Sequence, residues 1–282
     1  GSEMCIRDRL CASLSTRSPT NKRTPPMSCD LQGLSVLVTR PVKQADSLCE
    51  LIEQHQGRPI RFPALEITPA PDPEQARTEL AFASQADMLV FVSANAVEHA
   101  FPLLPDILPG ELVIAAIGRA TARKLKEYGL DPGLLPESGY DSEGLLAMEE
   151  LQHMDGKRVI IVRGNGGRSK LKDELEMRGA RVEYAEVYRR MLPDRSAANL
   201  LRGWSRLIDV VTATSNESLD NLFKMLGEEG QGKLLATPLL VVSQRMARHA
   251  EAMGCQQIYL ADDASDKAIL GELCLLLKEA NE

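Results

Sequence analysis

The run Gly33-Leu34-Ser35-Val36-Leu37-Val38-Thr39-Arg40 decides the fold, because it returns as Gly156-Lys157-Arg158-Val159-Ile160-Ile161-Val162-Arg163. Each copy holds a continuous apolar stretch between a glycine and an arginine, which is typical of a buried strand in a parallel sheet. The two copies are 123 residues apart (156 − 33). The chain therefore contains one α/β unit in two diverged copies.

Two further blocks recur in the same order. Phe91-Val92-Ser93-Ala94-Asn95 returns as Thr212-Ala213-Thr214-Ser215-Asn216, and Ile114-Ala115-Ala116-Ile117-Gly118-Arg119 returns as Leu240-Val241-Val242-Ser243-Gln244-Arg245. Because the order is preserved, the sequence predicts two similar lobes with a cleft between them. Ligands bind preferentially in such clefts.

Apolar periodicity predicts strands alternating with helices along the whole repeat. We expect strands over residues 34–39, 58–67, 88–92, 112–117, 158–162, 181–188, 208–213, 238–243 and 257–260. We expect helices over residues 44–56, 74–84, 94–104, 119–128, 142–152, 169–178, 196–204, 216–226, 244–253 and 266–279. This alternation indicates an α/β fold in which each lobe is a parallel sheet flanked by helices.

The connections predict where the chain passes between the lobes. The proline-dense stretch Pro63–Pro73 follows the second strand, and Tyr188–Pro193 is its counterpart, whereas the join at His153–Gly156 is a short turn. We therefore expect interdomain linkers at 65–69 and 188–193, forming a two-stranded connection. Domain 1 is then discontinuous (31–64 plus 194–282), and domain 2 spans 70–187.

Residues 1–30 differ in composition from the rest. The stretch up to Met27 is rich in Ser, Thr, Pro and Arg and has no periodic apolar face. We interpret residues 1–30 as a disordered leader or tag, with a transit peptide as the less favoured alternative.

Charge and cysteine usage narrow the class of protein. The chain has 282 residues, 4% aromatic residues and a net charge of −7, which argues against generic binding to nucleic acid or to an anionic membrane. Its six cysteines lack metal-binding or redox spacing, and Cys49 and Cys274 fall on apolar helical faces, so we expect them to pack in the core. No apolar run approaches the roughly 18 residues of a membrane span. We expect a protein of a reducing compartment, the cytoplasm.

The repeated junctions between strands and helices are the candidate binding groups. Ser93 and Ser215 are placed as N-caps, and Gly118 and Ser243 stand at the second pair of junctions. In open parallel sheets these junctions line the ligand crevice. Helix N-termini present free N–H groups that suit anions, although capping alone is the structural alternative for each serine.

Arginines stand at the same places. Arg40 and Arg163 end the two first strands, Arg119 and Arg245 open two helices, and Arg168 follows a glycine-rich turn. Guanidinium groups bind carboxylates or phosphates in fork geometry. The pattern predicts a polyanionic ligand.

Several catalytic motifs are absent from the sequence. No metal-ligand cluster, nucleophile elbow or Walker A loop occurs, and Gly164-Asn165-Gly166-Gly167-Arg168-Ser169 lacks the third glycine of a dinucleotide fingerprint. We expect no metal, and a reaction that depends on shape and pre-placed hydrogen bonds.

The chain resembles the uroporphyrinogen-III synthase family from about Leu31 to its C-terminus. The resemblance rests on Val38-Thr39-Arg40-Pro41 with Gln44, Phe62-Pro63, Phe91–Val97, Ala116-Ile117-Gly118 with Thr121-Ala122, Arg163-Gly164 with Gly167-Arg168, and Val187-Tyr188-Arg189. It implies a cofactor-free hydro-lyase with discontinuous domain wiring. The implied substrate is hydroxymethylbilane, a linear tetrapyrrole with eight carboxylates, which is cyclised with inversion of ring D and loss of water through an azafulvene cation. We expect a monomer, because no extra apolar helix is left over for an interface. A transient contact with hydroxymethylbilane synthase remains open.

Positions matched to the family give the candidate site. Tyr188 matches a tyrosine that helps the hydroxyl to leave, with packing at the hinge as the alternative, and Thr121 matches a threonine of the cleft. The full substrate-binding set is Arg40, Ser93, Asn95, Gly118, Arg119, Thr121, Arg163, Gly164, Arg168, Ser215, Ser243 and Arg245. Where many members read Ile-Gly-Pro-Thr-Thr-Ala, this chain has Val242–Ala247 without the paired threonines, so we expect Ser243 or Arg245 to replace them.

Two other functions remain open at this stage. One is a non-catalytic two-lobed binding protein for a small polyanionic ligand. The other is a nucleotide-dependent enzyme, which the incomplete glycine fingerprint disfavours.

Overall fold

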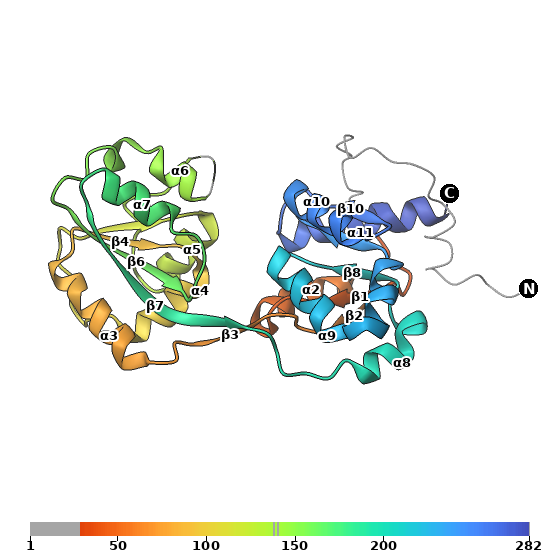
Figure 1. Cartoon of the computed structure of the whole chain (residues 1–282). Helices are drawn as coiled ribbons and strands as arrows, with labels where there is room; N and C mark the ends of the chain where they lie inside the picture. Colours follow the sequence, from red (N-terminus) through yellow and green to blue (C-terminus); the bar gives the residue numbers. More distant parts are fainter. Residues whose placement is uncertain (1–28, 138, 140, 282) are drawn as a thin grey trace, which may run out of the picture. The chain divides into compact units, whose positions relative to one another are not determined.

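The chain forms two compact units (Figure 1). The computed structural model describes residues 29–137, 139 and 141–281. One unit takes the described residues up to Glu66 together with those from Leu192 onward, and the other spans Ile67–Met191. The first unit is therefore built from two distant parts of the sequence.

The first unit is a five-stranded sheet covered by helices on both faces. Its strand order is β10-β9-β8-β1-β2, and these strands pair in parallel. The strands are β1 (Ser35–Val38), β2 (Arg58–Arg61), β8 (Val210–Thr212), β9 (Leu239–Val241) and β10 (Ile258–Leu260). The helices are α2 (Val42–Gln54), α8 (Ala198–Leu207), α9 (Asn216–Leu235), α10 (Gln244–Met253) and α11 (Asp266–Asn281).

Alternation along β1 divides the core of this unit. Leu37 packs in one apolar cluster with residues of α8, α9 and α10, where Trp204 is the largest fully buried side chain. Val36 and Val38 point to the other face and pack with α2 and α11. Because a strand buried on both faces needs apolar residues throughout, this arrangement explains the continuous run at 34–38.

The second unit repeats this plan. Its sheet has the order β3-β7-β6-β4-β5, in which β4, β5, β6 and β7 pair in parallel. The strands are β3 (Glu66–Pro69), β4 (Met88–Phe91), β5 (Val113–Ala116), β6 (Arg158–Gly164) and β7 (Arg181–Met191). The helices are α3 (Pro73–Ala81), α4 (Ala94–Ala100), α5 (Arg119–Glu127), α6 (Ser142–Leu146) and α7 (Lys170–Met177), with 3₁₀ turns at Phe82–Gln85, Phe101–Leu103 and Glu149–Leu151.

The predicted α/β fold class is confirmed, and the repeat accounts for the topology. The order β9-β8-β1-β2 in the first unit matches β5-β4-β6-β7 in the second. Repeated blocks therefore occupy equivalent strands: β1 and β6, β4 and β8, β5 and β9. Each unit combines the first half of one copy with the second half of the other.

The segments that we expected as linkers contain strands. The expected strand at 58–67 is two strands, β2 and β3, separated at Phe62–Leu65, where Pro63 has no N–H to donate. β3 lies beside β7 in the second sheet, and β7 continues to Met191. Residues 66–69 and 188–191 therefore belong to the sheet of the second unit.

Three helices differ most from their predicted lengths. α4 ends at Ala100 and continues as a 3₁₀ turn that contains Pro102, whose ring disfavours the α-helical hydrogen-bond pattern. The helix expected at 142–152 is α6 followed by a separate 3₁₀ turn. α9 runs to Leu235, well beyond residue 226, across a kink at Gly227 (φ 61°, ψ −177°).

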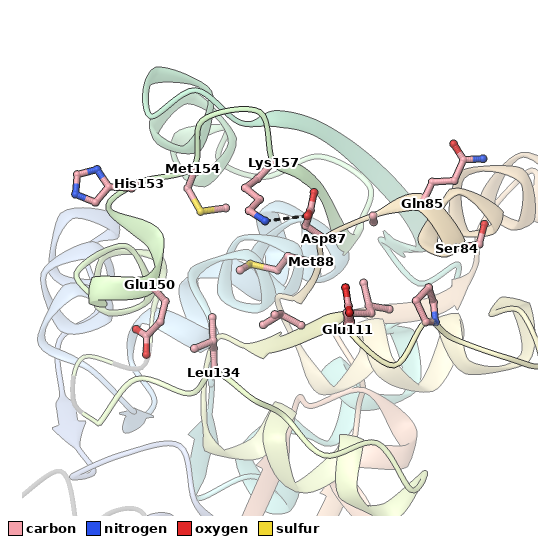
Figure 2. Close-up of a pocket in the computed structure, with 14 residues that line it drawn as sticks. Ser84, Gln85, Asp87, Met88, Glu111, Leu134, Glu150, His153, Met154 and Lys157 are labelled. Carbon is pink, nitrogen blue, oxygen red and sulfur yellow. Dashed lines mark hydrogen bonds and ion pairs between the residues drawn. The ribbon is translucent and has the colours of Figure 1, made fainter.

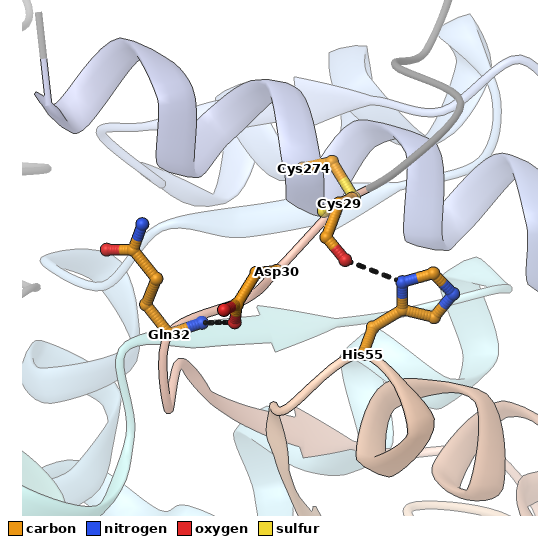
Figure 3. The surroundings of a disulfide bond; sticks show 5 residues. All are labelled: Cys29, Asp30, Gln32, His55 and Cys274. Atoms are coloured by element: carbon orange, nitrogen blue, oxygen red, sulfur yellow. Dashed lines mark hydrogen bonds between the residues drawn. A yellow bond between two sulfur atoms is a disulfide. The ribbon is translucent and has the colours of Figure 1, made fainter.

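Cys274 packs in the core as expected, but it also forms a disulfide with Cys29, which the sequence reasoning did not predict. His55 Nδ1 lies 2.7 Å from the carbonyl oxygen of Cys29 (Figure 3). Cys49 is buried and free, as expected. The predicted leader at 1–30 lies outside the described residues except for Cys29 and Asp30. In the part of the chain that the structure describes, no helix is long and apolar enough to cross a membrane.

Candidate functional site

The candidate residues gather at the carboxyl edges of the two sheets. In the second unit Phe91 pairs with Ala116 and with Val162, so the three following junctions lie at one edge. In the first unit Val38 pairs with Thr212, which pairs with Leu240, so the junctions that follow these strands also lie at one edge. This is the edge at which open parallel sheets bind ligands.

The hydroxyl residues at these junctions cap helices. Ser93 Oγ accepts from Ala96 N at 3.0 Å, Ser215 Oγ from Ser218 N at 3.0 Å, and Ser243 Oγ from Met246 N at 3.3 Å. The predicted N-caps at Ser93 and Ser215 are confirmed. Gly118 is the N-cap of α5 and has no side chain to offer, so the first-turn N–H groups there lack a side-chain cap.

Tyr188 lies at the carboxyl edge of the second sheet, on the inner strand β7. Its side chain is buried, with 4% of the residue exposed, and its hydroxyl oxygen is 3.2 Å from Ser93 Oγ. Gly164 is opposite Tyr188 in the β6–β7 ladder, just after a shift in register. A Cβ at position 164 would lie 2.5 Å from Cε2 and Cζ of the Tyr188 ring. Gly164 is therefore needed for the close approach of the phenol.

His99 contacts the same phenol and was missed by the sequence reasoning. The half-buried His99 ring stacks on Tyr188, with 5.7 Å between centroids and 29° between planes. Nothing in the sequence links positions 99 and 188, because the contact arises only when α4 packs on β7.

Arg163 and Arg168 belong to the glycine-rich turn that follows β6. Arg163 is buried, and its guanidinium donates from Nε to Gly164 O at 3.1 Å and from Nη1 to Arg168 O at 3.3 Å. Gly167 has φ +94°, and a Cβ there would lie 2.6 Å from Arg163 Nη2. Arg163 thus fixes the shape of the turn, while the Arg168 side chain is exposed.

Arg40 has internal partners as well. Its guanidinium forms an ion pair with Asp266 and donates to the carbonyl oxygen of Ala264. Asp266 also accepts from Ser47 Oγ at 2.6 Å. These contacts join the end of β1 to the first residue of α11, whereas Arg163, the counterpart of Arg40 in the repeat, donates to the carbonyl oxygens of Gly164 and Arg168.

The remaining predicted residues flank the junctions. Thr121 is 3% exposed in the first turn of α5, and Asn95 is half-buried at the start of α4. Arg119 and Arg245 are exposed in the first turns of α5 and α10. Asn216, the counterpart of Asn95, was left out of our set, although the repeat pointed to it. Its Oδ1 is buried and accepts no hydrogen bond from the described residues.

A cavity of about 460 Å³ lies at the opposite edge of the second sheet (Figure 2). Asp87 and Lys157 line it just before β4 and β6, and their side chains form an ion pair at 3.0 Å. Hydrogen bonds from the Arg158 N–H and from Lys157 hold the pKa of Asp87 below its usual value. No group of three or more His, Cys, Asp or Glu among the described residues is placed to hold a metal ion.

Comparison with known proteins identifies the family. The model of the family described as uroporphyrinogen-III synthase HemD matches residues 46–271. The chain belongs to the uroporphyrinogen-III synthase family. It is 34% identical over 252 residues to the uroporphyrinogen-III synthase of Escherichia coli K12, covering 85% of this chain and all of that protein. The enzyme from Salmonella typhimurium LT2 is 31% identical over the same coverage.

Solved uroporphyrinogen-III synthases have the same fold. A mutant enzyme from the extremely thermophilic bacterium Thermus thermophilus superposes with a TM-score of 0.62 at 18% identity, over 88% of this chain and all of that one. The enzyme from Helicobacter pylori 26695 gives a TM-score of 0.56 at 17% identity, over 86% of this chain and 99% of that one. The activity of the chain is that of its family, a hydro-lyase of porphyrin biosynthesis that forms uroporphyrinogen III.

Proposed function

We propose that the substrate is hydroxymethylbilane and that Tyr188 helps its hydroxyl group to leave. The observation that carries the proposal is the buried phenol at the carboxyl edge of β7, whose hydroxyl lies 3.2 Å from Ser93 Oγ. The phenol donates its proton to the hydroxymethyl oxygen, the C–O bond breaks, and its electron pair leaves with water. The hydroxymethyl carbon is left as part of the azafulvene cation, which the inversion of ring D requires.

Ser93 suits the phenolate that this step forms. Its Oγ accepts from Ala96 N, so its own O–H remains able to donate to the Tyr188 oxygen. A donor placed where negative charge develops stabilises a transition state without reorganisation. Tyr188 and Ser93 therefore act as one hydrogen-bonded pair.

The carboxylates of the bilane are held by the remaining junctions. α5, α9 and α10 begin at the carboxyl edges, and free N–H groups at such helix ends attract anions. The exposed Arg119, Arg168 and Arg245 supply guanidinium donors. Each charge-assisted hydrogen bond contributes about 1.5–3 kcal/mol, so several together hold a polyanion. Thr121 and Asn95 complete the polar carboxyl edge of the second unit, which Arg163 supports. Ser215 and Ser243 complete that of the first unit, which Arg40 supports.

The remaining expectations are part of the same proposal. The reaction proceeds without metal or cofactor, since proton transfer and anion binding are all that the cyclisation asks of the protein. The enzyme acts as a monomer in the cytoplasm. Because disulfides are rare in that compartment, the Cys29–Cys274 pair is the feature to examine in intact cells, by trapping free thiols before lysis.

An assay of the isomer ratio tests the proposal. Enzyme and hydroxymethylbilane are mixed, and the ratio of uroporphyrinogen III to uroporphyrinogen I is measured against an enzyme-free blank. We expect type III to dominate with the native chain and to fall sharply with Tyr188→Phe. A polyanion-binding protein without catalysis would leave the ratio at the blank value. A normal ratio and rate in Tyr188→Phe would remove Tyr188 from the mechanism.

A further inference from the structure

Helix α4 contacts the Tyr188 phenol at two points. Ser93, the N-cap residue, meets its hydroxyl at 3.2 Å, and His99, six residues further on, stacks on its ring. All three side chains belong to the second unit. One helix thus fixes both the end and the face of the phenol.

Other groups fix the backbone of Tyr188. Asn165 N donates to Tyr188 O at 2.9 Å, and Arg190 N donates to Asn165 Oδ1 at 2.9 Å. Gly164, opposite in the ladder, provides room for the ring and no side chain to hold it. The ring packs in the buried apolar cluster of this unit, and the His99 ring stacks on its face.

We propose that His99 is a positioning residue for Tyr188, acting through its ring face. The inference rests on the proposed role of Tyr188 in the loss of the hydroxyl group. The stack keeps the phenol in the orientation in which its hydroxyl reaches Ser93 and the departing oxygen. The nearly parallel planes, 29° apart, place the imidazole face against the phenol, so packing carries the effect.

The size of the effect follows from the energetics of aromatic pairs. An aromatic pair contributes free energy beyond the burial of its surface. When the ring orientation that the pair maintains matters only in the transition state, losing the pair changes a rate by roughly 3- to 10-fold. Binding of the substrate carboxylates is left intact. We therefore expect His99→Ala to lower kcat by about that factor with KM nearly unchanged.

Three variants at position 99 test the inference. His99→Phe keeps a flat ring and is expected to retain most of the native kcat and type III yield. His99→Ala and His99→Gln lose the ring and are expected to lose kcat about 3- to 10-fold. The isomer ratio is measured at a saturating concentration of enzyme. Under that condition a smaller amount of folded protein does not change the ratio. Equal kcat in all four proteins, or a Phe variant as poor as Ala, would overturn the proposal.

A double mutant separates this inference from the proposed function. In the Tyr188→Phe background, where no hydroxyl remains to be positioned, His99→Ala should cause little further loss. A fully active Tyr188→Phe enzyme contradicts the proposed function itself. An impaired Tyr188→Phe enzyme together with a fully active His99→Ala enzyme contradicts only the role of His99.

Asp72→Ala provides the control for stability. Asp72 caps α3 in the same unit by accepting from Gln75 N at 2.9 Å, a contact that does not involve Tyr188. Its loss should lower Tm by an amount typical of a removed cap while kcat stays native. A kcat loss in His99→Ala at a Tm equal to that of Asp72→Ala is then an effect on catalysis.

Discussion

Asp209 Oδ2 accepts a hydrogen bond at 2.8 Å from the backbone N–H of Ser35, 174 residues away in the sequence. Asp87 Oδ2 accepts from Arg158 N at the same distance. Each carboxylate precedes one strand and binds the first residue of the neighbouring strand, β1 or β6. The repeat therefore includes an aspartate clamp at the amino edge of each sheet, Asp209 with Ser35 N and Asp87 with Arg158 N. Each clamp aligns two neighbouring strands, in addition to the junctions at the carboxyl edge.

The two aspartate clamps should contribute unequally to the free energy of unfolding, because they differ in burial. Asp209 is 8% exposed, whereas the side chain of Asp87 is 41% exposed. A hydrogen bond to a buried charged group contributes about 1.5–3 kcal/mol, and exposure weakens it. We expect Asp209→Ala to lower the free energy of unfolding by about 2 kcal/mol and Asp87→Ala by less. Urea unfolding measures both, and a larger loss for Asp87→Ala would contradict the ranking.

The Asp87 clamp should also give a pH-dependent stability. The Arg158 N–H and the Lys157 ammonium lower the pKa of Asp87 in the folded state below its usual 3.8. The unfolded chain therefore binds this proton first, so the stabilisation is full above pH 3.8 and is lost as pH falls through the folded pKa. We expect Asp87→Asn to reduce the fall in Tm on acidification through that range. Parallel Tm curves for the native and variant proteins would exclude the effect.

The disulfide should be a large contributor to stability. It joins residues 245 positions apart, and closing so long a loop restricts the unfolded chain strongly. Chain-entropy arguments give about 5.5 kcal/mol, so reduction or Cys29→Ser should lower the urea midpoint clearly.

Thiol labelling supplies the control for the disulfide experiment. Cys255 is buried, and desolvation raises its pKa to about 11. It should stay unlabelled at neutral pH in the folded protein, with or without reductant. Cys274 should become labelled only after reduction. Labelling of Cys274 without reductant, or an unchanged midpoint in Cys29→Ser, would contradict the prediction.

Apart from the single strand expected at 58–67, the repeat was sufficient to predict the strands and the junctions, because buried parallel strands and their caps are local patterns. It could not give the end of β7, which lies beside β3, a partner distant in sequence. The arginines show the same limit. The sequence of a strand-to-helix junction does not show whether its arginine faces a ligand, as we propose for Arg245, or an internal carboxylate, as Arg40 does with Asp266. Tertiary partners decide between the two.

Arg40 and Arg245 should therefore differ when mutated. Arg40→Ala leaves Asp266 partly buried without its guanidinium, which should cost on the order of 3 kcal/mol of stability. Arg245→Ala should leave Tm unchanged and weaken binding of the polyanionic product, by about 10-fold if one charge-assisted contact is lost. Calorimetric titration with product and thermal unfolding measure the two effects. Unchanged product affinity in Arg245→Ala would assign Arg245 to the solvated surface.

Gly164 offers the sharpest steric test of the Tyr188 site. A methyl group there would lie 2.5 Å from Cε2 and Cζ of Tyr188, so Gly164→Ala must displace the phenol from Ser93. Overpacking of this kind costs about 1–3 kcal/mol of stability. Because the hydroxyl moves away from the departing oxygen, we expect kcat to fall at least as far as in His99→Ala, with KM changed little.

Gly110→Ala is the matched control for Gly164→Ala. It lies in the same unit, and nothing is within 4 Å of the Cβ position. The added methyl group should leave kcat, isomer ratio and Tm at their native values. A Gly164→Ala enzyme with native kcat would mean that the reaction tolerates displacement of the phenol. The role of Tyr188 would then be packing against Gly164 and His99 rather than proton donation.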